Sequence, residues 1–138
     1  MRQGEQVFVD TGAWIALALT RDPLHDRASE IWLSIKDDGL KLRTSVPVVL
    51  ETFTFLERNA MRDVALAWKD SVAKLSRLKT LECRPKDLDL CWPYFERRDL
   101  HKLSATDATS FVIMSREKIR IAFSFDHHFA VVGFGIVG

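Results

Sequence analysis

The chain is poor in cysteine, and this limits the classes of protein to which it can belong. It has only two cysteines among 138 residues, Cys83 and Cys91. They lie eight positions apart, which is not the spacing of a metal-binding knuckle. The pattern favours two free thiols, buried or half-buried, in a reducing cytosol, rather than a disulfide-stabilised scaffold.

Long apolar runs and an excess of charge are missing as well. No segment approaches the ~18 consecutive apolar residues that a membrane helix needs. The N-terminal segment MRQGEQ lacks the basic-then-apolar layout of a secretory signal, so we expect a cytoplasmic protein without a membrane partner. The 20 Lys and Arg residues against 19 Asp and Glu residues give a net charge of +1, which neither supports nor excludes a polyanionic substrate.

Internal repeats, low-complexity tracts and linkers rich in Gly, Ser or Pro are also absent from the sequence. Hydrophobic residues make up 47% of the chain and charged residues 28%, as in ordinary globular domains. A chain of this length can bury a substantial core. We therefore expect a single domain spanning residues 1–138.

Short apolar runs alternate with segments of helical periodicity along the chain. The strands are predicted at residues 6–9, 40–45, 79–83, 119–125 and 130–134. The helices are predicted at residues 13–20, 25–36, 45–56, 64–75, 86–99 and 104–118. Alternation of this kind indicates the α/β class, with a parallel sheet and helices on both of its faces.

Four acidic residues interrupt apolar segments. Asp10 and Asp126 each follow a predicted strand, so both should emerge at the carboxyl edge of the sheet, where ligands bind in open α/β folds. Glu51 lies on the apolar face of a helix, where an unpaired charge is costly. Asp107 lies in the first turn of the helix that begins at Ser104. These positions predict that the four carboxylates converge.

Each of these residues also has an ordinary structural explanation. Asp10 can cap the helix that follows it, and Asp126 can cap the turn DHHF. Asp107 completes a capping-box pattern with Ser104. Glu51 can pair with Arg43. Each explanation is acceptable for its own residue. Together, however, they require that four unrelated acids lie at the same end of the sheet by coincidence.

Convergent carboxylates would need a cation. They cannot all stay ionised unless a metal neutralises them or some of their pKa values rise. Oxygen ligands favour Mg²⁺ or Mn²⁺ over zinc, and such ions assist phosphodiester hydrolysis. His127 and His128, beside Asp126, add a second hypothesis of an imidazole ligand or general base, although the four carboxylates suffice for a hard ion.

The segments VFVDTGAWIAL, SVPVVLETFTFL, LSATDATSFVIMSREK and IRIAFSFDHHF occur in an order and at spacings that resemble a PIN domain. They are most similar to the toxin ribonucleases of VapC-type toxin–antitoxin pairs. The resemblance extends from about residue 6 to residue 134. Any one segment is weak evidence, whereas the four together are specific.

The resemblance implies a three-layer α/β/α fold, with a central parallel sheet of four to five strands flanked by helices. It implies an endoribonuclease that depends on Mg²⁺ (or Mn²⁺), forms a homodimer and is blocked by the C-terminal segment of a cognate antitoxin. A standalone RNA-processing nuclease is the alternative. The implied metal ligands are Asp10, Glu51, Asp107 and Asp126. Thr11 and Ser124 match the hydroxyl positions that orient the acids or the attacking water, and Gly12 departs from the common Ser or Asn.

An acidic site that holds RNA also needs cations around it to contact phosphates. The candidates from the sequence are Arg43, Arg116, Lys118 and Arg120. The four tryptophans, Trp14, Trp32, Trp68 and Trp92, lie on apolar helical faces, so we expect them in the core or in a dimer interface rather than stacked on bases.

Three other functions compete with the nuclease. Asp10-Thr11-Gly12 is also the triplet of aspartic proteases, but here it opens a helix, and those enzymes are rich in β-structure. An aspartyl-phosphate phosphotransferase would carry a second Asp two residues after Asp10, where this chain has Gly12. A PIN-like binding module without catalysis is disfavoured because all four acids are present.

Overall fold

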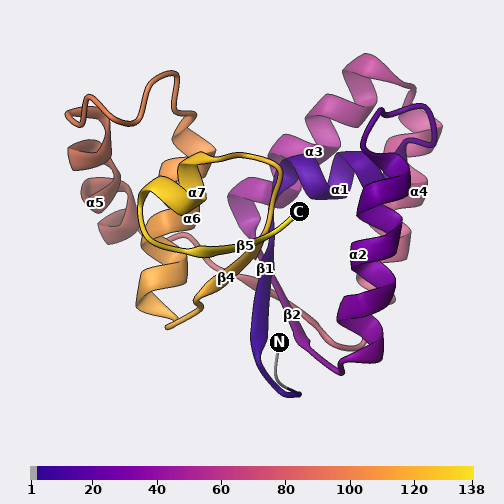
Figure 1. Ribbon diagram of the computed structural model, residues 1–138. Helices are drawn as coiled ribbons and strands as arrows, with labels where there is room; N and C mark the ends of the chain where they lie inside the picture. The colour runs from indigo at the N-terminus through magenta and orange to yellow at the C-terminus, as the bar shows by residue number, and fades with distance from the viewer. Residues whose placement is uncertain (1–2) are drawn as a thin grey trace.

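The computed structural model describes residues 3–138, which fold around one five-stranded parallel sheet (Figure 1). The order of the strands across the sheet is β3-β2-β1-β4-β5. In chain order the strands are β1 (Gln6–Val9), β2 (Lys41–Ser45), β3 (Leu78–Leu81), β4 (Ile121–Phe123) and β5 (Gly135–Val137).

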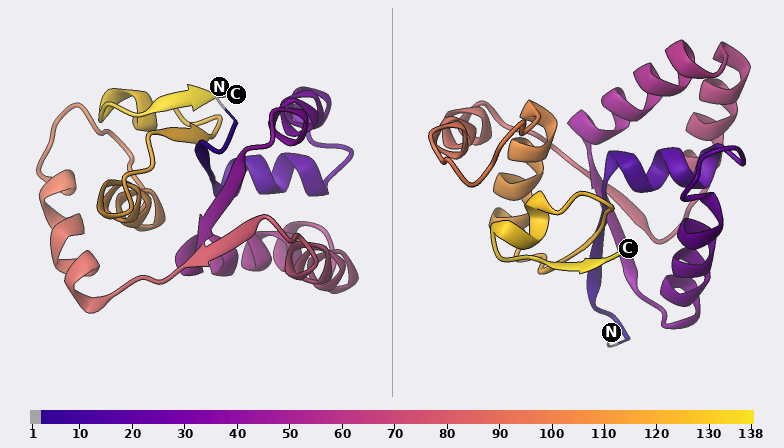
Figure 2. Two further views of the ribbon diagram at one scale, coloured as in Figure 1. Left: turned by 90° about the horizontal axis from the view of Figure 1, so that it is seen from below. Right: turned by 45° about the horizontal axis from the view of Figure 1, so that its top comes forward.

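Helices cover both faces of this sheet and complete a three-layer α/β/α arrangement. Figures 1 and 2 show α1 to α4 on one side of β1 and α5 to α7 on the other. The helices are α1 (Thr11–Ala18), α2 (His25–Asp37), α3 (Val46–Asn59), α4 (Arg62–Ala73), α5 (Pro85–Phe95), α6 (Ala105–Arg116) and α7 (His128–Val131).

The central strand β1 is short and wholly apolar after its first residue. Val7, Phe8 and Val9 are fully buried, as expected for a parallel strand that has helices on both faces. Phe8 pairs with Arg43 of β2 on one side and with Ala122 of β4 on the other. The strand is thereby fixed in the middle of the sheet, and the residue that follows it is placed with little freedom.

The direction of the chain across the sheet reverses beside β1. From β1 the chain proceeds outward through β2 to β3, and then it crosses to β4 and β5 on the opposite side of β1. The carboxyl ends of β1 and β4 therefore lie side by side, and the backbone N–H of Asp10 donates to the carbonyl oxygen of Phe123 at 3.0 Å. Ligands bind at such reversals in open α/β sheets.

The five parallel strands and the two helical layers agree with the sequence-based expectation, but the position of the last strand was wrong. Residues 130–134 were predicted as a strand, whereas α7 includes Ala130 and Val131, and β5 begins only at Gly135. Gly133 has a φ of 101° and turns the chain between the two elements. A short apolar run does not distinguish a strand from a helical turn.

The tryptophans divide into two groups. Trp14 and Trp68 are buried and Trp32 is partly buried; all three line an apolar hollow between α1, α2 and α4. Trp92, on α5, is 55% exposed and contacts Phe95 with ring centroids 6.4 Å apart. Cys83 and Cys91 are free thiols, as expected. Within residues 3–138, no helix is both long enough and apolar enough to cross a membrane.

Candidate metal centre

Asp10 follows β1 directly and is almost completely buried. It occupies the N-cap position of α1, but its side chain makes no capping hydrogen bond, so its structural explanation as a helix cap is wrong. Its Oδ2 atom instead accepts a hydrogen bond of 3.0 Å from Ser124 Oγ. The other oxygen, Oδ1, is buried and has no hydrogen-bond partner among residues 3–138.

Ser124 connects the two strand ends that carry Asp10 and Asp126. Its hydroxyl donates to Asp10, and its oxygen accepts the backbone N–H of Asp126 at 3.0 Å. Ser124 has no solvent exposure. Thr11 is also buried, and its Oγ1 atom has no hydrogen-bond partner within the described part of the chain. The two hydroxyls named from the resemblance thus lie at this edge of the sheet, one engaged and one free.

Asp107 lies in the first turn of α6, and its backbone and side chain have separate tasks. The backbone N–H donates to Ser104 Oγ at 3.0 Å, which caps the helix. The carboxyl group is hydrogen-bonded to Asp126. Burial, the negative charge of Asp10 and the contact with Asp126 raise the pKa of Asp107 well above its ordinary value.

Asp126 is the partly exposed partner of this pair. Its Oδ1 atom accepts the backbone N–H of His128 at 2.9 Å, so its predicted role in the DHHF turn is correct. Burial raises the pKa of Asp126, but the hydrogen bonds from Asp107 and from His128 outweigh burial, and the pKa falls below its ordinary value. The two carboxyl groups therefore titrate as a pair rather than independently.

Glu51 completes the set from α3. It is half-buried and contributes to the repulsion felt by Asp10. The predicted pairing of Glu51 with Arg43 was wrong, because Arg43 Nε donates to Gln6 Oε1 at 3.0 Å. Glu51 also lines a groove of about 500 Å³ along α3, together with Phe55, Arg58 and Thr106.

The electrostatics of the site call for a cation. Burial, together with the charges of Asp126 and Glu51, raises the pKa of Asp10 to about 7. Apart from His127 and His128, no cationic side chain of residues 3–138 makes an ion pair with any of the four acids. A set of carboxylate oxygens with one buried oxygen left unpaired fits a hard divalent cation.

The two histidines beside Asp126 differ in their surroundings. The side chain of His127 is 79% exposed, and its Nδ1 atom lies 3.8 Å from Asp126 Oδ1. His128 is buried, and its Nδ1 atom lies 2.9 Å from the same oxygen. One ligand atom from each of Asp126, His127 and His128 lies within 4.8 Å of the other two. The sequence placed both histidines beside Asp126, but it did not reveal that only His128 is buried or that its Nε2 atom lies against the carbonyl oxygen of His101.

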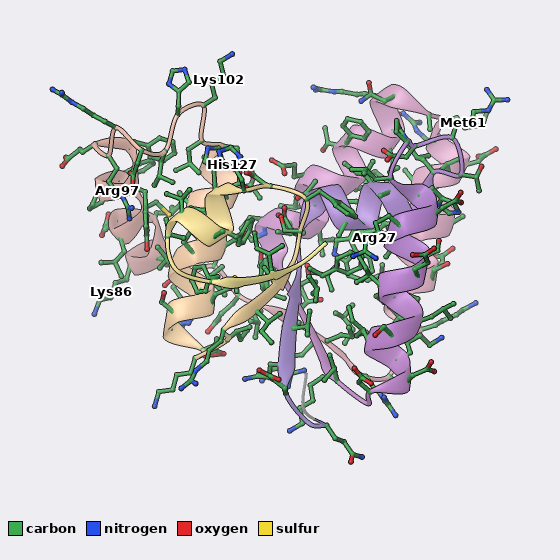
Figure 3. All side chains as sticks on the ribbon, in the orientation of Figure 1. Arg27, Met61, Lys86, Arg97, Lys102 and His127 are labelled. Atoms are coloured by element: carbon green, nitrogen blue, oxygen red, sulfur yellow. The ribbon has the colours of Figure 1, made fainter. Side chains whose placement is uncertain are left out.

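The basic residues predicted to surround the site were misplaced. Arg116 pairs with Asp87 and donates to the carbonyl oxygen of Glu82. Lys118 and Arg120 line a hollow with residues 4–6, at the amino end of β1 and so opposite to Asp10. The cations that sequence reasoning missed are Arg58, two helical turns after Glu51 on α3, and Lys102. Figure 3 shows Lys102 projecting outward from the loop above His127, at the carboxyl end of the sheet.

Comparison with known proteins places this geometry in a family. The model of the PIN domain matches residues 7–135. A curated relative, the 23S rRNA-specific endonuclease VapC20 of Mycobacterium tuberculosis, is 34% identical over 129 residues, which cover 93% of this chain and 95% of the relative.

Solved structures of VapC-type proteins have the same fold as this chain. The crystal structure of VapC20 from Mycobacterium tuberculosis, described as a sarcin–ricin loop cleaving toxin, has a TM-score of 0.81 at 30% identity, covering 93% of this chain and 95% of that one. VapBC2 from Rickettsia felis, bound to promoter DNA, has a TM-score of 0.71 at 12% identity, with coverages of 96% and 97%, and supports the fold alone. On this evidence the chain belongs to the PIN domain family.

Proposed function

We propose that this chain is an endoribonuclease that requires Mg²⁺ or Mn²⁺ and is the toxin of a toxin–antitoxin pair. The observation that carries the proposal is a group of acids at the carboxyl edge of the sheet that no Lys or Arg of residues 3–138 compensates by an ion pair. Asp10 keeps a buried oxygen without a hydrogen-bond partner among residues 3–138, and burial together with the neighbouring Asp10 and Asp126 raises the pKa of Asp107. An arrangement that is costly without a ligand is suited to bind one.

Asp10, Glu51, Asp107 and Asp126 are the proposed ligands of the cation. A bound Mg²⁺ or Mn²⁺ would supply charge stabilisation to the phosphodiester under attack. Ser124 holds Asp10 in one orientation through its 3.0 Å hydrogen bond, which directs the unpaired Oδ1 away from that contact. Thr11 has a hydroxyl without a partner, and we assign it to orient the attacking water.

RNA contacts are proposed on two sides of the acids. The groove along α3 contains Glu51, which is a proposed ligand, and Arg58, which can neutralise a phosphate. Phe55 is 39% exposed in the same groove and offers an aromatic face to a base. Lys102, on the loop between α5 and α6, offers a second cation at this end of the molecule.

The proposal is tested by RNA cleavage with purified protein. Wild type should cleave RNA with Mg²⁺ or Mn²⁺ and lose this activity in EDTA. Asp10→Asn should lower the rate by at least about 100-fold, because it removes a ligand, while the circular dichroism spectrum stays unchanged. Cleavage by rigorously purified Asp10→Asn at the wild-type rate would overturn the metal-site assignment.

The substrate class follows from the relative at 34% identity, which is named as an endonuclease of 23S rRNA. We propose structured ribosomal RNA as the substrate of this chain too. Ribosomes, deproteinised 23S rRNA and an unrelated tRNA should be compared, with primer extension to locate the cut. One cut in 23S rRNA would support the assignment, and equal degradation of all three RNAs would contradict it.

The proposed partners are a second copy of the chain and an antitoxin. VapC20 is described as a toxin, and Trp92 and Phe95 form an exposed aromatic pair on α5 that a second copy would cover. Light scattering of the purified protein tests the dimer. Growth arrest by wild type but not by Asp10→Ala, together with rescue by a neighbouring small gene, would separate a toxin from a standalone RNA-processing nuclease.

A further inference from the structure

The imidazole of His128 connects two parts of the site that are far apart in the sequence. It is buried, with 6% of the residue exposed, although it belongs to the four-residue helix α7 at the surface. Its Nε2 atom lies 2.8 Å from the carbonyl oxygen of His101, in the loop between α5 and α6. Its Nδ1 atom lies 2.9 Å from Asp126 Oδ1. The proposed ligand set does not include this ring.

The contact with His101 fixes how the ring presents its two nitrogens. A carbonyl oxygen only accepts hydrogen bonds, so Nε2 must carry a hydrogen and donate it. The Nδ1 atom then faces Asp126, and it attracts the carboxylate when it carries a hydrogen as well, as both nitrogens do in the imidazolium form. It approaches Oδ1 without the alignment of a regular hydrogen bond, yet at ion-pair distance. Contacts of this kind orient metal-binding groups in many sites.

On the other side, Asp126 Oδ1 is held by His128 twice. The backbone N–H donates to it at 2.9 Å, and the ring nitrogen lies at the same distance. The carboxylate therefore cannot rotate about its Cβ–Cγ bond without losing both contacts. One oxygen of Asp126 is engaged by His128, and Oδ2 is the oxygen that His128 leaves available.

The loop that contains His101 runs from Glu96 to Ser104 and is joined to the rest of the site at its far end. Ser104 caps α6 and so fixes the turn that bears Asp107. Lys102, next to His101, has a φ of 56°, a conformation that a side chain with a Cβ adopts only when its surroundings hold it. Figure 3 shows Lys102 and His127 projecting from this region at the same end of the molecule.

We propose that His128 is a positioning residue that orients Asp126 for metal binding and anchors the Lys102-bearing loop for RNA binding, which rests on the proposed function. The two halves of the ring divide these tasks. Nδ1 acts on the carboxylate, and Nε2 acts on the loop. The ring itself contacts neither metal nor substrate.

Two amide substitutions separate the halves of the ring. The amide nitrogen of Asn is placed near the position of Nδ1, and that of Gln near the position of Nε2. His128→Gln should keep the hydrogen bond to His101 and lose the contact with Asp126. His128→Asn should do the reverse. His127→Gln, at the exposed neighbour, is the matched control for imidazole ligation.

The variants are compared by two readouts. The first is Mn²⁺ affinity, measured by electron paramagnetic resonance, and the second is steady-state RNA cleavage. His128→Gln should weaken Mn²⁺ binding about 10-fold and lower kcat, as the loss of an orienting partner does elsewhere. His128→Asn should bind Mn²⁺ within about twofold of wild type and raise KM for RNA, because the loop loses its anchor. His127→Gln should leave Mn²⁺ affinity unchanged.

Three outcomes would overturn the proposal. One is that both His128 variants match wild type in Mn²⁺ affinity and KM. Another is that Asn and Gln weaken Mn²⁺ binding equally and His127→Gln weakens it as well, which would make the imidazoles ligands. The third is a nuclear magnetic resonance spectrum of the wild-type protein in which Nδ1 of His128 carries a hydrogen and Nε2 carries none. This test does not require either variant to fold.

The proposed nuclease activity can fail separately from this inference. If wild type cleaves no RNA, the proposed function is wrong, but the Mn²⁺ affinities of the two His128 variants still test the orientation of Asp126. If wild type cleaves RNA and the variants do not differ, the positioning role of His128 is wrong and the nuclease assignment stands.

Discussion

Asp87 and Asp107 occupy equivalent positions in neighbouring helices and have opposite electrostatic surroundings. Each is the third residue of its helix, α5 or α6, and each is buried. Asp87 is paired with Arg116 and accepts the backbone N–H of Arg84 at 2.8 Å. Although burial raises the pKa of Asp87, these contacts lower it below its ordinary value. Asp107 is hydrogen-bonded to another carboxyl group, and its pKa rises.

The difference separates a carboxylate that is paired with a cation and joins two helices from one whose side-chain neighbours are other acids. The Asp87–Arg116 pair joins α5 to α6 and is complete within the chain. The pair of Asp107 and Asp126 is complete only when a proton or a cation is added. Burying an acid without a cation lowers the stability of the fold, so this arrangement is maintained at the expense of stability.

The largest expected effect is on catalysis. Asp107→Asn should lower RNA cleavage by at least about 100-fold, because a proposed metal ligand is lost, whereas Asp87→Asn should cleave RNA at the wild-type rate per folded molecule. Both rates are measured at saturating Mn²⁺ and below the melting temperature of each variant. Equal losses in the two variants would remove the distinction between the two aspartates.

A smaller effect is expected on stability, and here Asp87→Asn should be the more damaging of the two substitutions. Asp87→Asn leaves Arg116 without its buried partner and should lower the free energy of unfolding by about 3 kcal/mol. Asp107→Asn retains the helix cap, because the acceptor is Ser104 Oγ, and its amide can still donate to Asp126. Urea unfolding without metal at pH 7 measures both; a larger loss for Asp107→Asn than for Asp87→Asn would mean that Asp107 is the structural residue.

The smallest effect is a pH slope of the metal-free protein. Asp10 binds a proton in the folded state up to a pKa of about 7, but in the unfolded state only up to its ordinary value of 3.8. The folded state therefore holds more protons between these values, and the free energy of unfolding falls as the pH rises from 5 to 7. Asp10→Asn should flatten this slope by roughly 1 kcal/mol per pH unit. Identical slopes for Asp10→Asn and wild type in urea titrations would show that Asp10 is not protonated.

Much of the architecture could be predicted because it depends on local patterns. The short run at residues 6–9 was predicted as a buried strand because helical segments follow it, and parallel strands require crossover helices. Asp10 and Asp126 were located because a parallel sheet brings the ends of its strands together. Glu51 and Asp107 were added by helical position and by resemblance, and the role of the four acids as metal ligands stays a prediction.

The errors came from equating closeness in sequence with closeness in space. Arg116 is only nine residues after Asp107, but nine residues of α-helix extend about 13 Å, so α6 carries it away from the site. The contact between His128 and the carbonyl of His101 joins residues 27 apart through a loop without regular structure. No periodic pattern marks such a contact, and only the fold reveals it.

The hydrogen bond from Ser124 to Asp10 joins residues separated by 114 positions, and this separation has a consequence for biosynthesis. Synthesis proceeds from the N-terminus, so a growing chain has Asp10, Glu51 and Asp107 well before it has β4. Until β4 pairs with β1, Asp10 lacks the hydrogen bond from the Ser124 hydroxyl, and Asp126 is not held near Asp10. The proposed metal centre is therefore completed only after most of the chain has left the ribosome that makes it.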